Sequence, residues 1–246
     1  MNGSGSGPST DYPYYDGQPV AVSAAGWCVI LSGVALAFVA LVSIPASGFP
    51  ATLIPALLFV LIPLCFLAAV TGRHWTALFR KVGLRQIGQM LVFGLLTMLV
   101  SVVVGYVVAT TLGAAPNPLV GSFGDLTWSA FAITLIPTVP QLFGEELLSI
   151  LPFLALLWLA YTRLGLSRTA SVALALIGSS ALFAAAHLPT YQWNWGQAFG
   201  IIGSARIVLT LAYIWTKNLW VSAGAHIIND WSEFTFVYAI SGNASE

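Results

Sequence analysis

Two long stretches without a charged residue constrain this chain more than any other feature. No Asp, Glu, Lys or Arg occurs from Gly17 to Gly72 or from Gln86 to Gly124. A helix needs about 20 apolar residues to cross the hydrocarbon core of a bilayer, so these stretches have room for three spans. The apolar runs are continuous rather than alternating, which predicts helices and not the strands of a barrel.

The composition of the whole chain agrees with this prediction and excludes other classes of protein. The 246 residues include 8 Lys+Arg and 8 Asp+Glu, so that only 7% are charged, and the mean hydropathy is +0.90. An ordinary soluble domain has about 25% charged residues. The formal net charge is zero, which leaves no basic face for a nucleic acid. The sequence therefore predicts a multi-pass protein of the cell membrane whose main partner is the lipid bilayer.

We expect an all-α fold with seven or eight transmembrane helices in one membrane domain. Residues 1–20, rich in Gly, Ser, Pro and Tyr, are predicted to be a flexible polar tail, and residues 21–246 form the domain. Whether 128–163 is one broken helix or two short ones stays open, although Pro137, Pro140 and Gly144 favour a break just before an acidic pair. The expected spans are 22–45, 51–71, 87–113, 128–144, 145–163, 169–187, 199–217 and 219–240.

The segment 73–86 sets the expected orientation in the membrane. It holds half of the cationic residues, namely Arg73, Arg80, Lys81 and Arg85. A short basic loop between two spans is cytoplasmic by the positive-inside rule, so the N-terminus is also expected inside. If 128–163 crosses the membrane once, the later basic residues are inside and the C-terminus outside; if it crosses twice, the reverse holds.

Ionisable residues inside spans are costly and mark functional sites, and here they all follow residue 128. We therefore interpret about 22–113 as scaffold and about 125–240 as the functional half. A hairpin that turns near Leu166 would bring Glu145, Glu146 and His187 to one depth. A straight-helix estimate leaves His226 shallower by about 10 Å. The residues concerned are Glu145, Glu146, His187, Arg206, His226, Asp230 and Glu233.

These side chains could serve as a general base or as metal ligands. No cofactor is expected; the alternative is a divalent metal such as zinc at Glu145, His187 and His226, which would have to be assembled from three helices. Each residue also has a structural interpretation: the two glutamates as a pair at a helix start, His187 as a helix-end residue and His226 as a core histidine. Glu233, on the same helical face as His226, is predicted to be mainly structural.

Three motifs in order carry a resemblance to a known family. They are Glu145-Glu146 followed by Leu-Leu-Ser-Ile150, then Phe183-Ala-Ala-Ala-His187, then His226-Ile-Ile-Asn229-Asp230. With these motifs the sequence resembles the type II CAAX-prenyl-endopeptidase and bacteriocin-processing family of intramembrane proteases, which includes lysostaphin-resistance-like proteins. The resemblance covers about residues 125–240.

The resemblance implies roles for these residues. Glu145 would be the general base that activates a water, and His187 and His226 would orient that water and stabilise the oxyanion. Asp230 stands where the family has Asn, and the neighbouring Asn229 could serve instead. Glu146 would belong to a supporting ion pair, and Phe183 opens the second motif.

One departure from the family pattern leads to a specific prediction. Ile150 replaces the motif Arg, which would leave Glu146 without its usual cation. Arg206 is the only Arg within a predicted span, and we expect it to pair with Glu146 or Asp230.

The predicted function is an intramembrane endopeptidase acting on a peptide or membrane-protein substrate near the membrane boundary. One alternative is a catalytically degenerate scaffold or immunity-type relative. A less favoured one is a proton-coupled transporter, which would call for polar residues in both halves of the chain.

Overall fold

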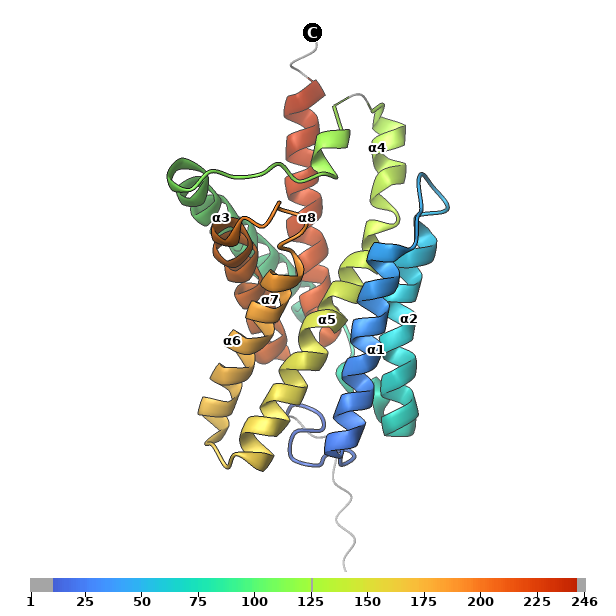
Figure 1. Ribbon diagram of the computed structural model, residues 1–246, viewed down its shortest axis with the longest axis vertical. Coiled ribbons are helices and arrows are strands. Elements are labelled where there is room, and N and C mark those ends of the chain that lie inside the picture. Colours follow the sequence, from blue (N-terminus) through green and yellow to red (C-terminus); the bar gives the residue numbers. More distant parts are fainter. Residues whose placement is uncertain (1–10, 125, 243–246) are drawn as a thin grey trace, which may run out of the picture.

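The computed structural model describes residues 11–124 and 126–242, and within them every regular element is helical (Figure 1). The elements are α1 (Ala24–Ser43), α2 (Leu53–Thr71), η1 (Gly72–Leu78), α3 (Leu84–Thr111), η2 (Val120–Ser122), α4 (Trp128–Leu135), α5 (Thr138–Trp158), η3 (Leu159–Arg163), α6 (Arg168–Ala186), η4 (Gly196–Ile202), α7 (Gly203–Thr216) and α8 (Leu219–Gly242). The expected all-α fold is thus confirmed for the described residues.

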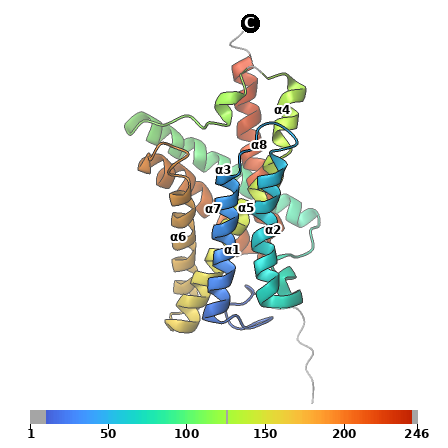
Figure 2. The same cartoon turned by 45° about the vertical axis from the view of Figure 1, so that its right-hand side comes forward.

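The helices form a bundle in which α5 is central. The hairpin of α1 and α2 packs on one side of α5, and α6 packs on another (Figures 1 and 2). Helix α3 packs against α7 and α8, and α8 also contacts α5. The glycine at 144 allows the close approach of α2, because a Cβ there would lie 2.3 Å from the Phe59 ring. The C-terminal half of the bundle therefore packs against the N-terminal hairpin through α5.

Side-chain caps and one proline set the helix boundaries. The hydroxyls of Ser23, Thr127 and Ser167 accept hydrogen bonds from backbone N–H groups in the first turns of α1, α4 and α6, which satisfies donors that a helix start leaves unpaired. Pro137 separates α4 from α5. The chain bends there because a proline ring clashes with the preceding turn. The break expected just before the acidic pair is therefore wrong: the helix is continuous through Gly144.

Six helical segments of the described chain are long and apolar enough to cross a membrane, so the expected seven or eight spans are not confirmed. The segment 128–163 counts as one of the six, because α4, α5 and η3 follow each other in one direction (Figure 1). Helix α8 is not among them; it carries the polar face that includes His226 and Asp230. The six segments are Ala24–Ser43, Leu53–Leu78, Leu84–Thr111, Trp128–Arg163, Arg168–Ala186 and Gly196–Thr216.

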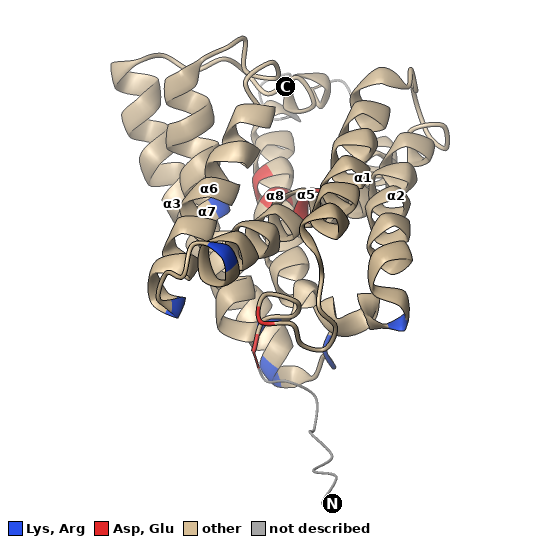
Figure 3. Ribbon diagram, turned by 60° about the horizontal axis from the view of Figure 1, so that its bottom comes forward, with Lys and Arg blue, Asp and Glu red and all other residues tan. Residues whose placement is uncertain are grey.

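One end of the bundle gathers the basic turns and the N-terminal segment. The described part of the chain begins at this end, and the C-terminus lies at the other (Figures 1 and 3). Since 128–163 runs through the bundle once, the basic turns after it lie at the same end as η1. Seven cationic residues lie in or beside these turns: Arg73, Arg80, Lys81, Arg85, Arg163, Arg168 and Lys217.

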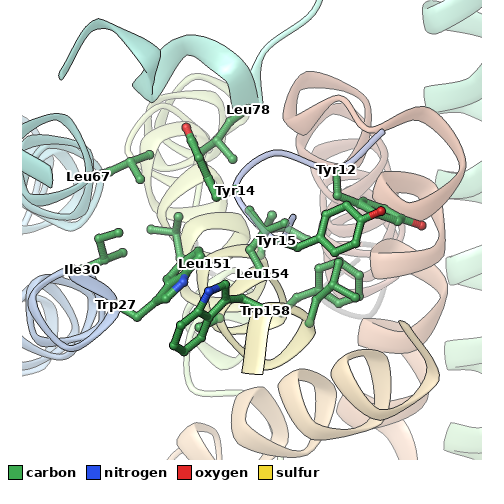
Figure 4. Close-up of a cluster of buried hydrophobic side chains, with 14 of the residues drawn as sticks. Tyr12, Tyr14, Tyr15, Trp27, Ile30, Leu67, Leu78, Leu151, Leu154 and Trp158 are labelled. Atoms are coloured by element: carbon green, nitrogen blue, oxygen red, sulfur yellow. The ribbon is translucent and has the colours of Figure 1, made fainter. Parts of the chain in front are cut away.

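Residues 11–20 are packed against this end, which corrects the predicted flexible tail for that part; residues 1–10 lie outside the described residues. The rings of Tyr12, Tyr14 and Tyr15 are buried in the main hydrophobic cluster (Figure 4). The carboxylate of Asp11 accepts two hydrogen bonds from Arg168, of 2.6 and 3.0 Å. Three aromatic rings thus provide enough apolar surface to hold a segment that otherwise looks polar.

Candidate active site

A buried ion pair joins α5 to α7 behind the site. Nη2 of Arg206 lies 2.7 Å from Oε1 of Glu146, and both side chains are 0% exposed. The guanidinium also lies over the Phe183 ring of α6, 5.0 Å from its centre. The predicted pairing of Arg206 with Glu146 is therefore confirmed, and the cation that the motif lacks at Ile150 comes from a different helix.

His226 on α8 is held by the same carboxylate. Its Nδ1 donates to Oε1 of Glu146 over 2.9 Å. Its Nε2 then faces two further carboxylates, at 3.7 Å from Oε2 of Glu145 and 3.6 Å from Oδ1 of Asp230. A histidine whose Nδ1–H is fixed in this way presents Nε2 for chemistry. The depth difference expected from straight helices does not exist, since His226 reaches both glutamates.

His187 is oriented in a similar way at the end of α6. Its Nδ1 donates to the carbonyl oxygen of Phe183 over 2.8 Å, and the two rings lie 4.4 Å apart. His187 is the residue that follows the last turn of α6, so the helix-end interpretation describes its position. Because its Nδ1 is committed to the backbone, Nε2 is the nitrogen left to interact with a ligand.

A cavity of about 470 Å³ brings the predicted residues together. Glu145, His187, His226 and Asp230 all line it, together with Asn229. Figure 3 shows the acidic residues of α5 and α8 inside the bundle, away from the basic end. The hairpin of α5 and α6 has thus brought Glu145 and His187 to the same cavity. Residues of the connection between α3 and α4, and of the connection between α6 and η4, also line the cavity.

The two adjacent glutamates occupy different environments. The side chain of Glu145 is 12% exposed and lines the cavity, where the amide of Gln141 donates to its Oε1 over 3.3 Å. Glu146 is fully buried and does not reach the cavity wall. The pair lies well inside α5, which begins at Thr138, so the interpretation as a pair at a helix start is wrong.

Asp230 and Asn229 both contribute to the cavity wall. Nδ2 of Asn229 donates to Oδ1 of Asp230 over 2.9 Å. Adjacent residues of a helix point in different directions, yet both of these line the cavity. Among residues 11–124 and 126–242, no group of three or more His, Cys, Asp or Glu side chains is arranged to hold a metal ion.

Three further residues of the site carry no strong sequence signal. Gln141 lies one helical turn before Glu145, and that spacing is the only hint in the sequence. Asn117 and Tyr191 come from connections between helices and line the cavity. Burial, followed by the nearby carboxylates of Asp230 and Glu145, raises the pKa of Tyr191 to about 12, so its hydroxyl stays neutral and can donate a hydrogen bond.

Comparison with known proteins gives one family. The family model described as type II CAAX prenyl endopeptidase Rce1-like matches residues 126–232, which confirms the resemblance carried by the three motifs. The matched segment runs from just before α4 into α8 and includes Glu145, His187 and His226. Neither a curated protein nor a solved structure matches the chain.

Proposed function

We propose, from the match of residues 126–232 to the family model described as type II CAAX prenyl endopeptidase Rce1-like, that this chain is a glutamate-dependent intramembrane endopeptidase. At the family level this similarity suggests a membrane protease. The proposal adds which residues hydrolyse the peptide bond. The main support for the proposal is the different placement of the two glutamates. Glu145 lines the cavity, whereas Glu146 lies outside the cavity wall and is bound by Arg206 and His226.

Glu145 acts as the general base. Its carboxylate takes a proton from a water while the water oxygen attacks the carbonyl carbon of the scissile peptide. The carbonyl oxygen becomes an oxyanion, and His187 and His226 stabilise it by donating an Nε2–H. Because Nδ1–H of each ring is already donated to Glu146 or Phe183, this role requires each histidine to carry a proton on both ring nitrogens. The C–N bond then breaks, the proton passes from Glu145 to the departing amine, and a carboxylic acid and an amine leave the cavity.

Glu146 and Arg206 position His226. The carboxylate of Glu146 fixes the Nδ1–H of His226 at 2.9 Å, and Arg206 keeps that carboxylate charged and in place. A preorganised donor of this kind does not need to reorganise as the oxyanion forms. Asp230, 3.6 Å from Nε2 of His226, steadies the imidazole from the side of the cavity.

The interpretation as a degenerate scaffold rested on the loss of a cation beside Glu146. Arg206 supplies that cation, so this argument for inactivity falls away. We also propose that the basic end of the bundle is cytoplasmic, because short basic loops stay on that side. The cavity then receives its substrate from the opposite half of the membrane. We expect no cofactor in this reaction.

The experiment compares peptide cleavage by the wild-type full chain and two variants in proteoliposomes. The probes are a quenched fluorescent peptide that ends in a farnesylated CAAX sequence and the same peptide without the lipid. Replacing Glu145 with Gln should lower the rate by about 10²–10⁴-fold and leave the melting temperature unchanged. The matched control is Asp16→Asn, which removes an exposed carboxylate at the basic end and should leave the rate unchanged. Wild-type rates in Glu145→Gln would refute the assigned base.

A further inference from the structure

Helix α8 carries a polar patch of three residues, of which the proposed reaction uses only Asp230, as a neighbour of His226. Asn229, Asp230 and Glu233 all line the cavity. Glu233 lies seven residues after His226, which corresponds to about 10 Å along the helix axis. It follows His226 in the direction of the C-terminus, away from the basic end of the bundle. The patch therefore extends the cavity wall beyond the site where the water is activated.

The patch contains hydrogen-bond acceptors without matching donors. Asn229 is 5% exposed. Its Nδ2 donates to Asp230, whereas its Oδ1 has no hydrogen-bond partner. Oε1 of Glu233 is also buried without a hydrogen-bond partner. A buried acceptor that stays unpaired costs free energy. A ligand that donates hydrogen bonds would satisfy these acceptors.

The cavity supplies no cation of its own to this patch. Arg206 is the only Lys or Arg among the described residues that line the cavity, and it is bound to Glu146. The ion pairs of the described chain place no Lys or Arg beside Asp230 or Glu233. Two carboxylate residues and Asn229 thus line the cavity, and the one ring nitrogen that the ion pairs place near Asp230 belongs to His226.

We propose that Asn229, Asp230 and Glu233 form a subsite for a cationic side chain, Lys or Arg, of the peptide substrate. This inference rests on the proposed function. An ammonium group has three donors and no acceptor, which matches the three acceptor groups of the patch. Entry of the substrate removes water from the carboxylates, and a cation then replaces the hydration that they lose.

The length of the helix also limits where the cation lies in the substrate. About 10 Å separates Glu233 from His226 along α8, and an extended peptide advances about 3.3 Å per residue. The subsite therefore binds the side chain of a residue about two or three positions from the scissile bond.

The test uses pairs of peptides with the wild-type chain in proteoliposomes. Starting from the peptide that the wild type cleaves, Lys is placed at each of three positions on either side of the scissile bond. Each Lys peptide is compared with one that has norleucine, an uncharged residue of equal length, at the same position. One Lys position should give kcat/KM about tenfold above its norleucine partner, as expected for hydrogen bonds to a charged group.

Two substitutions of Glu233 then assign the preference to the patch. Glu233→Gln should lower kcat/KM for the preferred Lys peptide to the norleucine level and leave the norleucine peptide unchanged. Glu233→Lys should favour a peptide with Glu at that position instead. Asp16→Asn, far from the cavity, is the control and should keep the wild-type preference. Melting temperatures show whether each variant folds.

The outcomes separate this inference from the proposed function. If the wild type cleaves Lys and norleucine peptides equally at every position, the subsite is refuted while the protease remains. If Glu233→Gln slows both peptides alike, Glu233 is structural and the subsite is likewise refuted. If the wild type cleaves none of the peptides, the proposed function fails and the subsite fails with it. Should both variants fail to fold, the wild-type comparison alone decides.

Discussion

Replacing Arg206 with Met tests the buried ion pair at the back of the site. Met keeps most of the side-chain length but removes the charge, so the loss of packing is small. The fully buried Glu146 then loses its Arg partner and keeps the hydrogen bond with His226. Removing one partner of a buried ion pair costs about 3–5 kcal/mol, because it leaves the other charge without compensation. The contact of the guanidinium with the Phe183 ring is lost as well.

The measurement is the free energy of unfolding of the purified protein in mixed micelles, followed through titration with a denaturing detergent. The control is Arg73→Met, which removes an exposed Arg from η1 and should change the stability by less than about 0.5 kcal/mol. The double variant Glu146→Gln with Arg206→Met should lose less than the sum of the single variants, since it leaves no unpaired charge.

A small effect would refute the reasoning. If Arg206→Met costs less than about 1 kcal/mol, the pair behaves like a solvent-exposed salt bridge. The guanidinium would then not be the cation that Glu146 requires, and the replacement of the motif Arg by Arg206 would have to be abandoned. Additive losses in the double variant would contradict the direct contact in the same way.

Two further predictions concern other parts of the chain. Burial opposes ionisation of Asp11, but hydrogen bonds from Arg168, Tyr15 and the backbone outweigh it and lower its pKa below the ordinary value. The ionised Asp11 therefore stabilises the fold fully above about pH 4, and this contribution is lost as the pH falls through the lowered pKa. The difference in melting temperature between wild type and Asp11→Asn should then shrink between pH 6 and pH 3. A difference that stays constant over this range contradicts the prediction. Gly144→Ala should destabilise by about 1–3 kcal/mol, since the new Cβ would lie 2.3 Å from the Phe59 ring. The control Gly88→Ala, with nothing within 4 Å of the new Cβ, should be neutral in the same unfolding assay.

The helical fold, and the grouping of Glu145, His187, His226 and Asp230 around one cavity, could be predicted because polar residues are rare in apolar spans. In a chain with 7% charged residues, each carboxylate or imidazole within an apolar run needs a reason to be there. Helical spacing and a short turn were then enough to bring Glu145 and His187 together. The straight-helix estimate failed for His226, because it ignored how the helices tilt and pack against one another.

Other features depended on contacts that the sequence does not encode locally. Nothing in the Gly- and Tyr-rich start of the chain indicates that Tyr12 packs against Phe153 and Tyr213, at 5.7 and 6.4 Å between ring centres. The expected number of spans was also not confirmed, since six segments of the described chain qualify. Pro140 and Gly144 resemble a helix break in isolation, but both residues lie within α5. Pro140 sits in its first turn, where a proline costs no hydrogen bond.

Arg206 gives Glu146 a cation from α7, although residue 150 of α5 is apolar. A carboxylate that orients His226 inside a low-dielectric bundle needs a cation, and either α5 or a facing helix can provide it. Residue 150 is now part of the main hydrophobic cluster, 0% exposed. A second guanidinium at that position would have to be buried among apolar side chains. The two arrangements therefore exclude each other: with Arg206 on α7, an apolar residue at 150 is what the packing requires. The missing Arg is then no sign of lost activity.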